Sequence, residues 1–240
     1  MSKIADKLKR VRDNINAACS RASRDPAEIK LVVVTKSVEI DEIQEVIRLG
    51  CRDLGENRVQ QLKKVAAQVD EFMAKGSADP NPSGPVNWHM IGHLQRNKVK
   101  QVLPIISMVH SVDTLRLAEE INTESATLNI CPMALLQVNT SMEPQKFGVP
   151  VGAAIHLAEQ IATLPNLKLA GLMTMAPLTR DSQVIRDCFV RARELFIEMR
   201  GEGIVGREFN DLSMGMSSDY EIAVEEGATI LRIGSAIFSR

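Results

Sequence analysis

The chain has 240 residues, and 29 Lys and Arg against 30 Asp and Glu give a formal net charge of −1 at pH 7. This balance provides no strong basic field for nucleic acid or an anionic membrane, and an aromatic content of 3% argues against platforms that stack bases. The four cysteines are widely spread, with no C-x-x-C pair and no metal-ligand spacing, so we expect neither a zinc site nor a disulfide framework.

The first segment is predicted to be an amphipathic helix. Leu8, Val11 and Ile15 belong to an apolar series at helical spacing, and Asp25-Pro26 marks the end of the helix or the turn after it. The N-terminus lacks the apolar core of a signal peptide, and no apolar run approaches the length that crosses a membrane. We therefore expect a cytoplasmic protein.

A repeating alternation of strands and helices follows. Residues 29–35 form a short, β-branched apolar run, which is typical of a strand buried on both faces of a parallel sheet. Residues 40–49 have a helical pattern, which Gly50 closes. The further strands are predicted at residues 52–55, 88–91, 107–110, 134–139, 168–173, 211–214 and 229–233. The further helices are predicted at residues 59–72, 97–103, 114–121, 152–164, 182–199 and 220–226.

Eight strands that alternate with helices predict an α/β fold, a single (β/α)8 TIM barrel over residues 1–240 with an extra N-terminal helix. The last strand is followed by few residues, so the N-terminal helix could take the remaining place in the outer ring. A doubly wound open sheet is the alternative. Residues 74–87 are rich in Gly, Pro, Ser and Asn and are predicted to be a surface loop insertion, because strands on both sides of them complete one sheet.

Lys36 stands at the end of the first predicted strand. A lysine is unusual there, because its ammonium group must reach water or a polar cleft, and the C-terminal ends of barrel strands face the active site. Partial burial would lower the pKa of this lysine and favour the neutral amine that attacks an aldehyde. The alternative is a lysine that simply emerges into solvent.

Two turns near the end of the chain have the composition of an anion site. Arg232-Ile233-Gly234-Ser235 ends the eighth strand, and barrel phosphate sites often lie after strands seven and eight. Gly234 would let backbone N–H groups approach an anion, and Ser235 could add a hydrogen bond. Ser217 lies just ahead of a predicted helix, whose start can bind an anion. The alternatives are an ordinary glycine turn and, for the S-x-x-E pattern from Ser218, a plain helix cap.

Asn57 and His89 are further candidates for the same cleft. Asn57 ends Gly55-Glu56-Asn57 after the second strand, and His89 lies in the third strand. Considered alone, Asn57 is more typical of a helix cap and His89 of an interior histidine.

These segments, in this order, resemble the pyridoxal phosphate homeostasis protein family, whose fold is similar to the N-terminal barrel of alanine racemase. The resemblance covers nearly the whole chain. The matching segments are Val33-Val34-Thr35-Lys36, Gly55-Glu56-Asn57, Trp88-His89-Met90-Ile91-Gly92 with Leu94-Gln95-Arg96-Asn97-Lys98, Gly171-Leu172-Met173, Ser213-Met214-Gly215-Met216-Ser217-Ser218-Asp219 and Arg232-Ile233-Gly234-Ser235.

The resemblance implies one site for pyridoxal 5′-phosphate (PLP). Its implied residues are Lys36 as the Schiff-base lysine, Ser217, Gly234 and Ser235 as phosphate ligands, Arg232 facing the pyridine nitrogen, and Asn57 and His89 in the pocket. The resemblance also implies a monomer that acts in vitamin B6 and amino-acid homeostasis, with PLP-dependent apoenzymes as recipients of PLP.

Catalysis is not expected to be substantial. A cationic Arg232 disfavours protonation of the ring nitrogen, which an acidic partner promotes in many PLP enzymes. Alanine racemase also has an arginine there, but it takes a second acid/base, a tyrosine, from an added domain. The sole tyrosine of this chain, Tyr220, matches no such motif. The alternative is a low-activity PLP-dependent amino-acid racemase or decarboxylase, and a Schiff-base aldolase without PLP would not need the phosphate turns.

Overall fold

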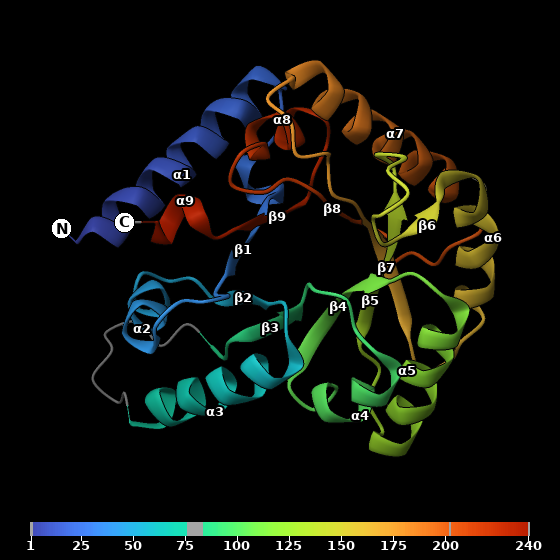
Figure 1. Ribbon diagram of the computed structural model, residues 1–240, viewed down its shortest axis with the longest axis horizontal. Helices are drawn as coiled ribbons and strands as arrows, with labels where there is room; N and C mark the ends of the chain where they lie inside the picture. The colour runs from blue at the N-terminus through green and yellow to red at the C-terminus, as the bar shows by residue number, and fades with distance from the viewer. Residues whose placement is uncertain (1, 76–83, 202, 240) are drawn as a thin grey trace.

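The strands of the protein close into a parallel barrel with helices around it (Figure 1). The structure, a computed structural model, describes residues 2–75, 84–201 and 203–239. Around the barrel the order is β1–β2–β3–β4–β5–β7–β8–β9, with β9 paired to β1. Pairing of β4 with β5 completes the ring, so the predicted (β/α)8 barrel is confirmed and the open sheet is wrong.

The barrel strands are β1 (Lys30–Val34), β2 (Asp53–Glu56), β3 (Asn87–Met90), β4 (Ile106–Val112), β5 (Met133–Asn139), β7 (Lys168–Met173), β8 (Asp211–Ser213) and β9 (Ile230–Ile233). A two-residue strand, β6 (Val149–Pro150), pairs with the end of β5. The helices are α1 (Lys3–Arg21), α2 (Ile40–Arg48), α3 (Val59–Lys75), α4 (Val99–Val102), α5 (Leu115–Leu128), α6 (Val151–Ala162), α7 (Ser182–Gly201), α8 (Tyr220–Glu225) and α9 (Ser235–Phe238), with 3₁₀ turns η1 (Pro26–Glu28) and η2 (Arg96–Lys98).

Helix α1 completes the outer ring. Its buried face carries Leu8, Val11 and Ile15, and Ser2 caps its start by accepting a hydrogen bond from the N–H of Ala5. The helix packs against α8, α9 and α2 (Figure 1). Because α9 has only 4 residues, α1 covers the side of the barrel that the last strand leaves open, as predicted.

Apolar side chains fill two regions on opposite faces of the strands. The larger cluster lies between the strands and the helices and includes Val33 of β1, whereas its neighbour Val32 belongs to a small cluster inside the barrel. This alternation is the side-chain period of a β-strand. The inner cluster contains Val32, Met108, Leu135, Ala170, Met173 and Ile230. Buried polar side chains, among them His89, His110, Ser213 and Arg232, lie in the same barrel.

The predicted surface loop at residues 74–87 is narrower in the structure. Residues 76–83 lie outside the described residues, residues 74 and 75 end α3, and residue 87 begins β3. Among the helices that the structure describes, none has the length and apolar character required to cross a membrane.

Candidate functional site

A cavity of about 460 Å³ opens at the C-terminal ends of the barrel strands. Strand ends and the turns after them supply its wall, as expected for a barrel site. It is lined by Val34, Lys36, Asn57, Ile91, Gly92, His93, Gln137, Phe147, Met175, Met216, Ser217, Ser218, Arg232, Gly234 and Ser235. No carboxylate occurs among these described residues, whereas Lys36 and Arg232 bring positive charge.

Six of the seven predicted site residues meet at this cavity. They come from segments far apart in the chain and lie after β1, after β2, after β8, in β9 and after β9. These residues are Lys36, Asn57, Ser217, Arg232, Gly234 and Ser235.

His89 lies elsewhere, and the structure corrects the expectation that it lines the pocket. Its side chain points into the barrel interior with 1% of its surface exposed. Its Nδ1 lies 2.9 Å from Nε2 of His110, and its Nε2 lies 3.0 Å from Oδ1 of Asp53. The reason is its position within β3: Ile91, two residues further and on the same face of the strand, reaches the cavity instead.

Lys36 follows β1 and is exposed, although it lines the cavity. The preceding Thr35 is fully buried and donates a 2.6 Å hydrogen bond to Oε1 of Glu56, which also lies close enough to interact with the charge of Lys36. Burial raises the pKa of the Glu56 carboxyl, and the hydrogen bond from Thr35 opposes this. The next residue, Ser37, has φ of 60°, a left-handed conformation that is uncommon outside glycine.

Arg232 is a buried cation in the wall of the cavity. It is 4% exposed; its Nη1 donates to Oγ of Ser213 at 2.6 Å and its Nη2 donates to the carbonyl of Thr174 at 2.9 Å. Burial lowers the pKa of Arg232 to about 10, and Asp219 opposes the shift. Arg232 therefore stays charged at neutral pH, with its orientation held by two hydrogen bonds.

The turns after β8 and β9 lie against each other. Oγ of Ser217 accepts hydrogen bonds from the backbone N–H groups of Gly234 at 3.3 Å and Ala236 at 3.1 Å. A Cβ at Gly234 would lie 3.0 Å from the carbonyl oxygen of Val34, which shows how closely the last turn approaches β1. The hydroxyl of Ser217 and the backbone N–H groups of the last turn thus meet at the cavity wall.

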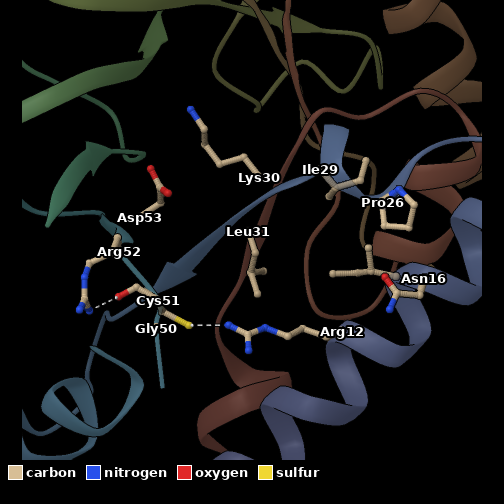
Figure 2. Close-up of a pocket in the computed structure, with 11 residues that line it drawn as sticks. Arg12, Asn16, Pro26, Ile29, Lys30, Leu31, Gly50, Cys51, Arg52 and Asp53 are labelled. Carbon is tan, nitrogen blue, oxygen red and sulfur yellow. Dashed lines mark hydrogen bonds between the residues drawn. The ribbon is translucent and has the colours of Figure 1, made fainter. Parts of the chain in front are cut away.

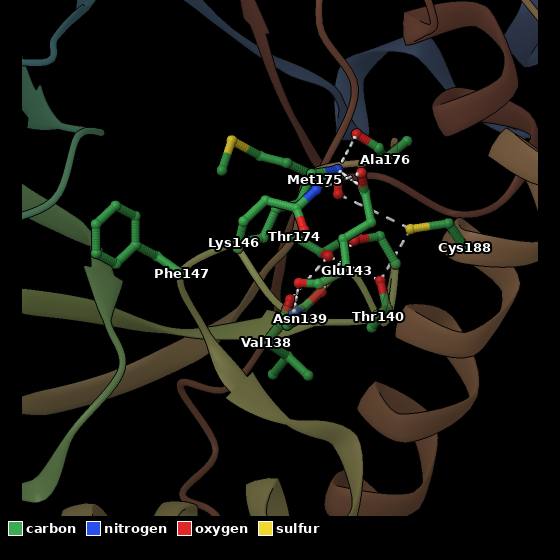
Figure 3. A network of polar contacts seen from close by, with 12 residues as sticks. Val138, Asn139, Thr140, Glu143, Lys146, Phe147, Thr174, Met175, Ala176 and Cys188 are labelled. Atoms are coloured by element: carbon green, nitrogen blue, oxygen red, sulfur yellow. Dashed lines mark hydrogen bonds and ion pairs between the residues drawn. The ribbon is translucent and has the colours of Figure 1, made fainter. Parts of the chain in front are cut away.

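The segment after β5 brings an aromatic ring to the cavity. Lys146 is tied down by an ion pair with Glu143 and a 2.9 Å hydrogen bond to the carbonyl of Ala176. Figure 3 shows Phe147 directed away from this polar network. Phe147 stacks on His93, with ring centroids 4.4 Å apart and an interplanar angle of 15°, although 57% of its surface is exposed. The pair forms an exposed part of the cavity wall.

Residues 7–239 match the family of alanine racemase N-terminal domains. A pyridoxal phosphate homeostasis protein of Aquifex aeolicus is 39% identical over 238 residues, which cover 97% of this chain and 96% of that protein. The chain belongs to the pyridoxal phosphate homeostasis protein family. The same name applies to a protein of Escherichia coli strain K12 that is 37% identical over 243 residues, which cover 99% of this chain and 97% of that protein.

A solved structure gives the same fold for the family. PipY of Synechococcus elongatus PCC7942 is 30% identical and superposes with a TM-score of 0.83, covering 98% of this chain and 100% of that chain. It has been solved with PLP bound and without PLP.

Several lining residues of this family member were missed from the sequence. His93, Gln137, Phe147 and Met175 line the cavity, but none of them ends an apolar strand with a recognisable motif. The one available signal was that His93 directly follows the Trp88–Gly92 segment. The chain leaves β3 there at the C-terminal face of the barrel, where the site lies.

Ser218 was interpreted as a helix cap, and this prediction is wrong. Asp219 is the N-cap residue of α8, and no side chain caps this helix. The carboxylate of Asp219 instead accepts a hydrogen bond from the backbone N–H of Met216. Ser218 is consequently free of the cap role and lines the cavity beside Ser217.

Proposed function

We propose that this chain binds PLP in the cavity, with Lys36 as the Schiff-base lysine, and that it acts in intracellular PLP (vitamin B6) and amino-acid homeostasis. The observation that carries the proposal is the meeting of Lys36, Arg232 and the turns of Ser217 and Gly234 in one cavity whose described lining residues include no carboxylate. PLP, when bound, supplies an aldehyde that reacts with amines and a ring that can accept electrons.

The donor set fits the two ends of PLP. The hydroxyl of Ser217 accepts from two backbone N–H groups and keeps its own hydrogen to donate, which suits a phosphate because hydrogen bonds to an ionised acceptor are the strong ones. Two of the five N–H groups of Arg232 bond to protein, and the residue lines the cavity, so the guanidinium can also donate to a ring nitrogen. Such a donor disfavours protonation of that nitrogen.

A role as carrier rather than enzyme follows from the same residues. A second acid/base beside Lys36 would be needed for proton transfer on both faces of an amino acid's α-carbon. The hydroxyl of Tyr220 accepts a 2.9 Å hydrogen bond from Asn14 on α1, and Tyr220 is not among the described lining residues. The alternative, a low-activity racemase or decarboxylase, is favoured by one observation: His93 lines the cavity.

Attachment to Lys36 is tested by borohydride reduction of the PLP-loaded protein and peptide mapping. We expect PLP on the peptide that contains Lys36, and none after Lys36→Ala. Lys168→Ala, at an exposed lysine that begins β7, is the control and should be labelled like the parent. Label on another peptide of the parent protein would contradict the assignment.

The phosphate site is tested by comparing PLP with pyridoxal. Because charge-assisted hydrogen bonds contribute roughly 1.5–3 kcal/mol each, pyridoxal should bind at least about tenfold more weakly. Ser217→Ala should weaken PLP binding and leave pyridoxal binding nearly unchanged. Equal affinities of the parent for both compounds would refute the phosphate role of Ser217, Gly234 and Ser235.

Catalysis is tested by deuterium exchange at the α-carbon of L- and D-amino acids. We expect no exchange at many turnovers per second. Rapid exchange that is lost in both Lys36→Ala and His93→Gln would establish the enzyme instead.

Delivery of PLP is the corresponding cellular step. We propose that the protein is a cytoplasmic monomer and that PLP-dependent apoenzymes receive its PLP. Light scattering should give the mass of one chain, and an apoenzyme should be activated by the loaded protein even when a scavenger removes free PLP. Activation only through free PLP would exclude direct transfer.

A further inference from the structure

Five polar side chains form one continuous chain of contacts through the barrel interior. Nη1 of Arg232 lies 2.6 Å from Oγ of Ser213, and Oγ of Ser213 lies 3.0 Å from Nδ1 of His110. Nε2 of His110 lies 2.9 Å from Nδ1 of His89, and Nε2 of His89 lies 3.0 Å from Oδ1 of Asp53. The residues come from β9, β8, β4, β3 and β2, so the chain crosses the barrel from side to side. We call these five residues the relay.

The relay joins two cavities. Arg232 lines the cavity at the C-terminal ends of the strands, whereas Asp53 lines a second cavity, of about 330 Å³, at their N-terminal ends. Figure 2 shows Asp53 and Lys30 at the edge of this second cavity. The side chain of Asp53 keeps 23% of its surface exposed there, whereas His89, His110 and Ser213 are at most 1% exposed.

The positions of the hydrogens follow from the two ends. A guanidinium only donates, so Ser213 accepts from Arg232, and we assign its single hydrogen to Nδ1 of His110. Burial lowers the pKa of His110 well below its usual value, so this ring is neutral and carries its hydrogen on Nε2, facing Nδ1 of His89. His89 then donates from Nε2 to the carboxylate of Asp53. Every hydrogen bond points from the cation to the anion.

Other charged groups lie near the relay. Lys30 on β1 interacts with Asp53 and His110, and Asp211 on β8 interacts with Lys30 and His89. Asp219, ahead of α8, interacts with Arg232. With the hydrogen of His110 on Nε2, a second proton on His89 would place two hydrogens between the imidazole rings, so this arrangement requires an acceptor at Nδ1 of His89.

We propose that Ser213, His110, His89 and Asp53 are positioning residues for Arg232, and that the relay fixes the direction in which its guanidinium donates into the PLP pocket. This inference rests on the proposed function, because the ring nitrogen of PLP is the acceptor. Three of the four residues are buried and none of the four lines the pocket, yet they act on the ligand through Arg232.

The relay itself is tested without PLP, by long-range ¹H–¹⁵N correlation NMR of the histidine rings. In the ligand-free protein, His89 and His110 should both be neutral, with the hydrogen on Nε2. The exposed His156 is the internal reference. A hydrogen on Nδ1 of either buried ring would overturn the proposal.

Two variants, each with a control outside the relay, then test whether the effects come from the relay itself. Ser213→Ala cuts the chain beside Arg232 and should change the ring signals of His110. It should weaken PLP binding about tenfold, as expected for one hydrogen bond to a charged group. Ser107→Ala, which removes a serine of β4 that bonds to the carbonyl of Trp88, is the matched control and should change neither. Unchanged PLP affinity in Ser213→Ala would overturn the positioning role.

The second variant acts at the far end of the barrel. Asp53→Asn removes the anion that sets the direction, so both tautomers should be populated in His110, which Asp53 does not touch. Asp211→Asn makes the same change in charge outside the relay and should leave the tautomers unchanged. If the ring signals of His89 change and those of His110 do not, the coupling of Asp53 to His110 is refuted. Failure of the parent protein to label at Lys36 would instead refute the proposed function, and the NMR result distinguishes the two failures.

Discussion

Arg232→Met is expected to stabilise the ligand-free protein while weakening its affinity for PLP. Burial lowers the pKa of Arg232 from 12.5 to about 10. At 1.36 kcal/mol per pKa unit, this difference means that the fold disfavours the charged guanidinium by about 3 kcal/mol. The variant removes this cost because methionine is uncharged and of comparable length.

The same variant also removes two hydrogen bonds. Ser213 and the carbonyl of Thr174 each lose a donor, at a net cost of about 1 kcal/mol per bond. The balance predicts that the ligand-free variant is about 1 kcal/mol more stable than the parent, which corresponds to about 2–4 °C in Tm for a chain of this size. Water that reaches the cavity can hydrogen-bond to the carbonyl of Thr174 in the variant, which also favours a more stable variant.

Urea denaturation with and without PLP measures both effects. Without PLP, the variant should have a higher midpoint and an unchanged m value. With PLP, the parent gains stability through binding and the advantage of the variant should disappear. Arg232→Lys keeps the charge but loses the forked geometry, so it should be less stable than the parent. A ligand-free Arg232→Met protein that is less stable than the parent would refute this reasoning.

Three further predictions concern the walls and the far end of the barrel. Gly92→Ala should destabilise the protein by about 2–3 kcal/mol in urea denaturation, because its Cβ would lie 2.2 Å from the carbonyl oxygen of Asn57. The pKa of Asp53 is lowered: burial would raise it, but its hydrogen bond with His89, together with its other polar contacts, outweighs burial. A carboxyl group with a lowered pKa stabilises the fold at pH values above the pKa of the unfolded state. The stability difference between the parent and Asp53→Asn should therefore shrink as the pH falls below about 4. Phe147→Ala should change stability by less than about 1 kcal/mol, because the ring is half exposed, yet stopped-flow measurements should show PLP leaving about threefold faster or more.

The sequence predicted the barrel because its strands are continuous apolar runs separated by helical patterns. The ends of elements were less predictable. Helix α5 continues to Leu128, seven residues beyond the predicted end at Ile121, because polar residues hide the pattern; Asn129, with φ of 52°, ends it. In place of the helix predicted at residues 97–103, the structure has η2 followed by the short α4.

The candidate site was predictable where a strand ends in a motif and not where a loop folds back. Lys36, Ser217 and Arg232 are fixed by strand positions, so the barrel topology alone brings them together. Phe147 reaches the cavity through a loop that Lys146 fastens to the carbonyl of Ala176, 30 residues away in sequence. No local pattern contains that contact.

The interior of this barrel differs from the usual filling of branched apolar side chains in layers. His89, His110, Ser213 and Arg232 occupy part of the space beside the small apolar cluster. A buried polar network is tolerable only when its members are paired, and even then apolar residues of similar volume often give a more stable protein. The relay meets the first condition, and the expected gain from Arg232→Met illustrates the second. Packing alone therefore does not explain why these polar residues occupy the barrel. The need to keep the guanidinium of Arg232 charged and oriented in the cavity explains them.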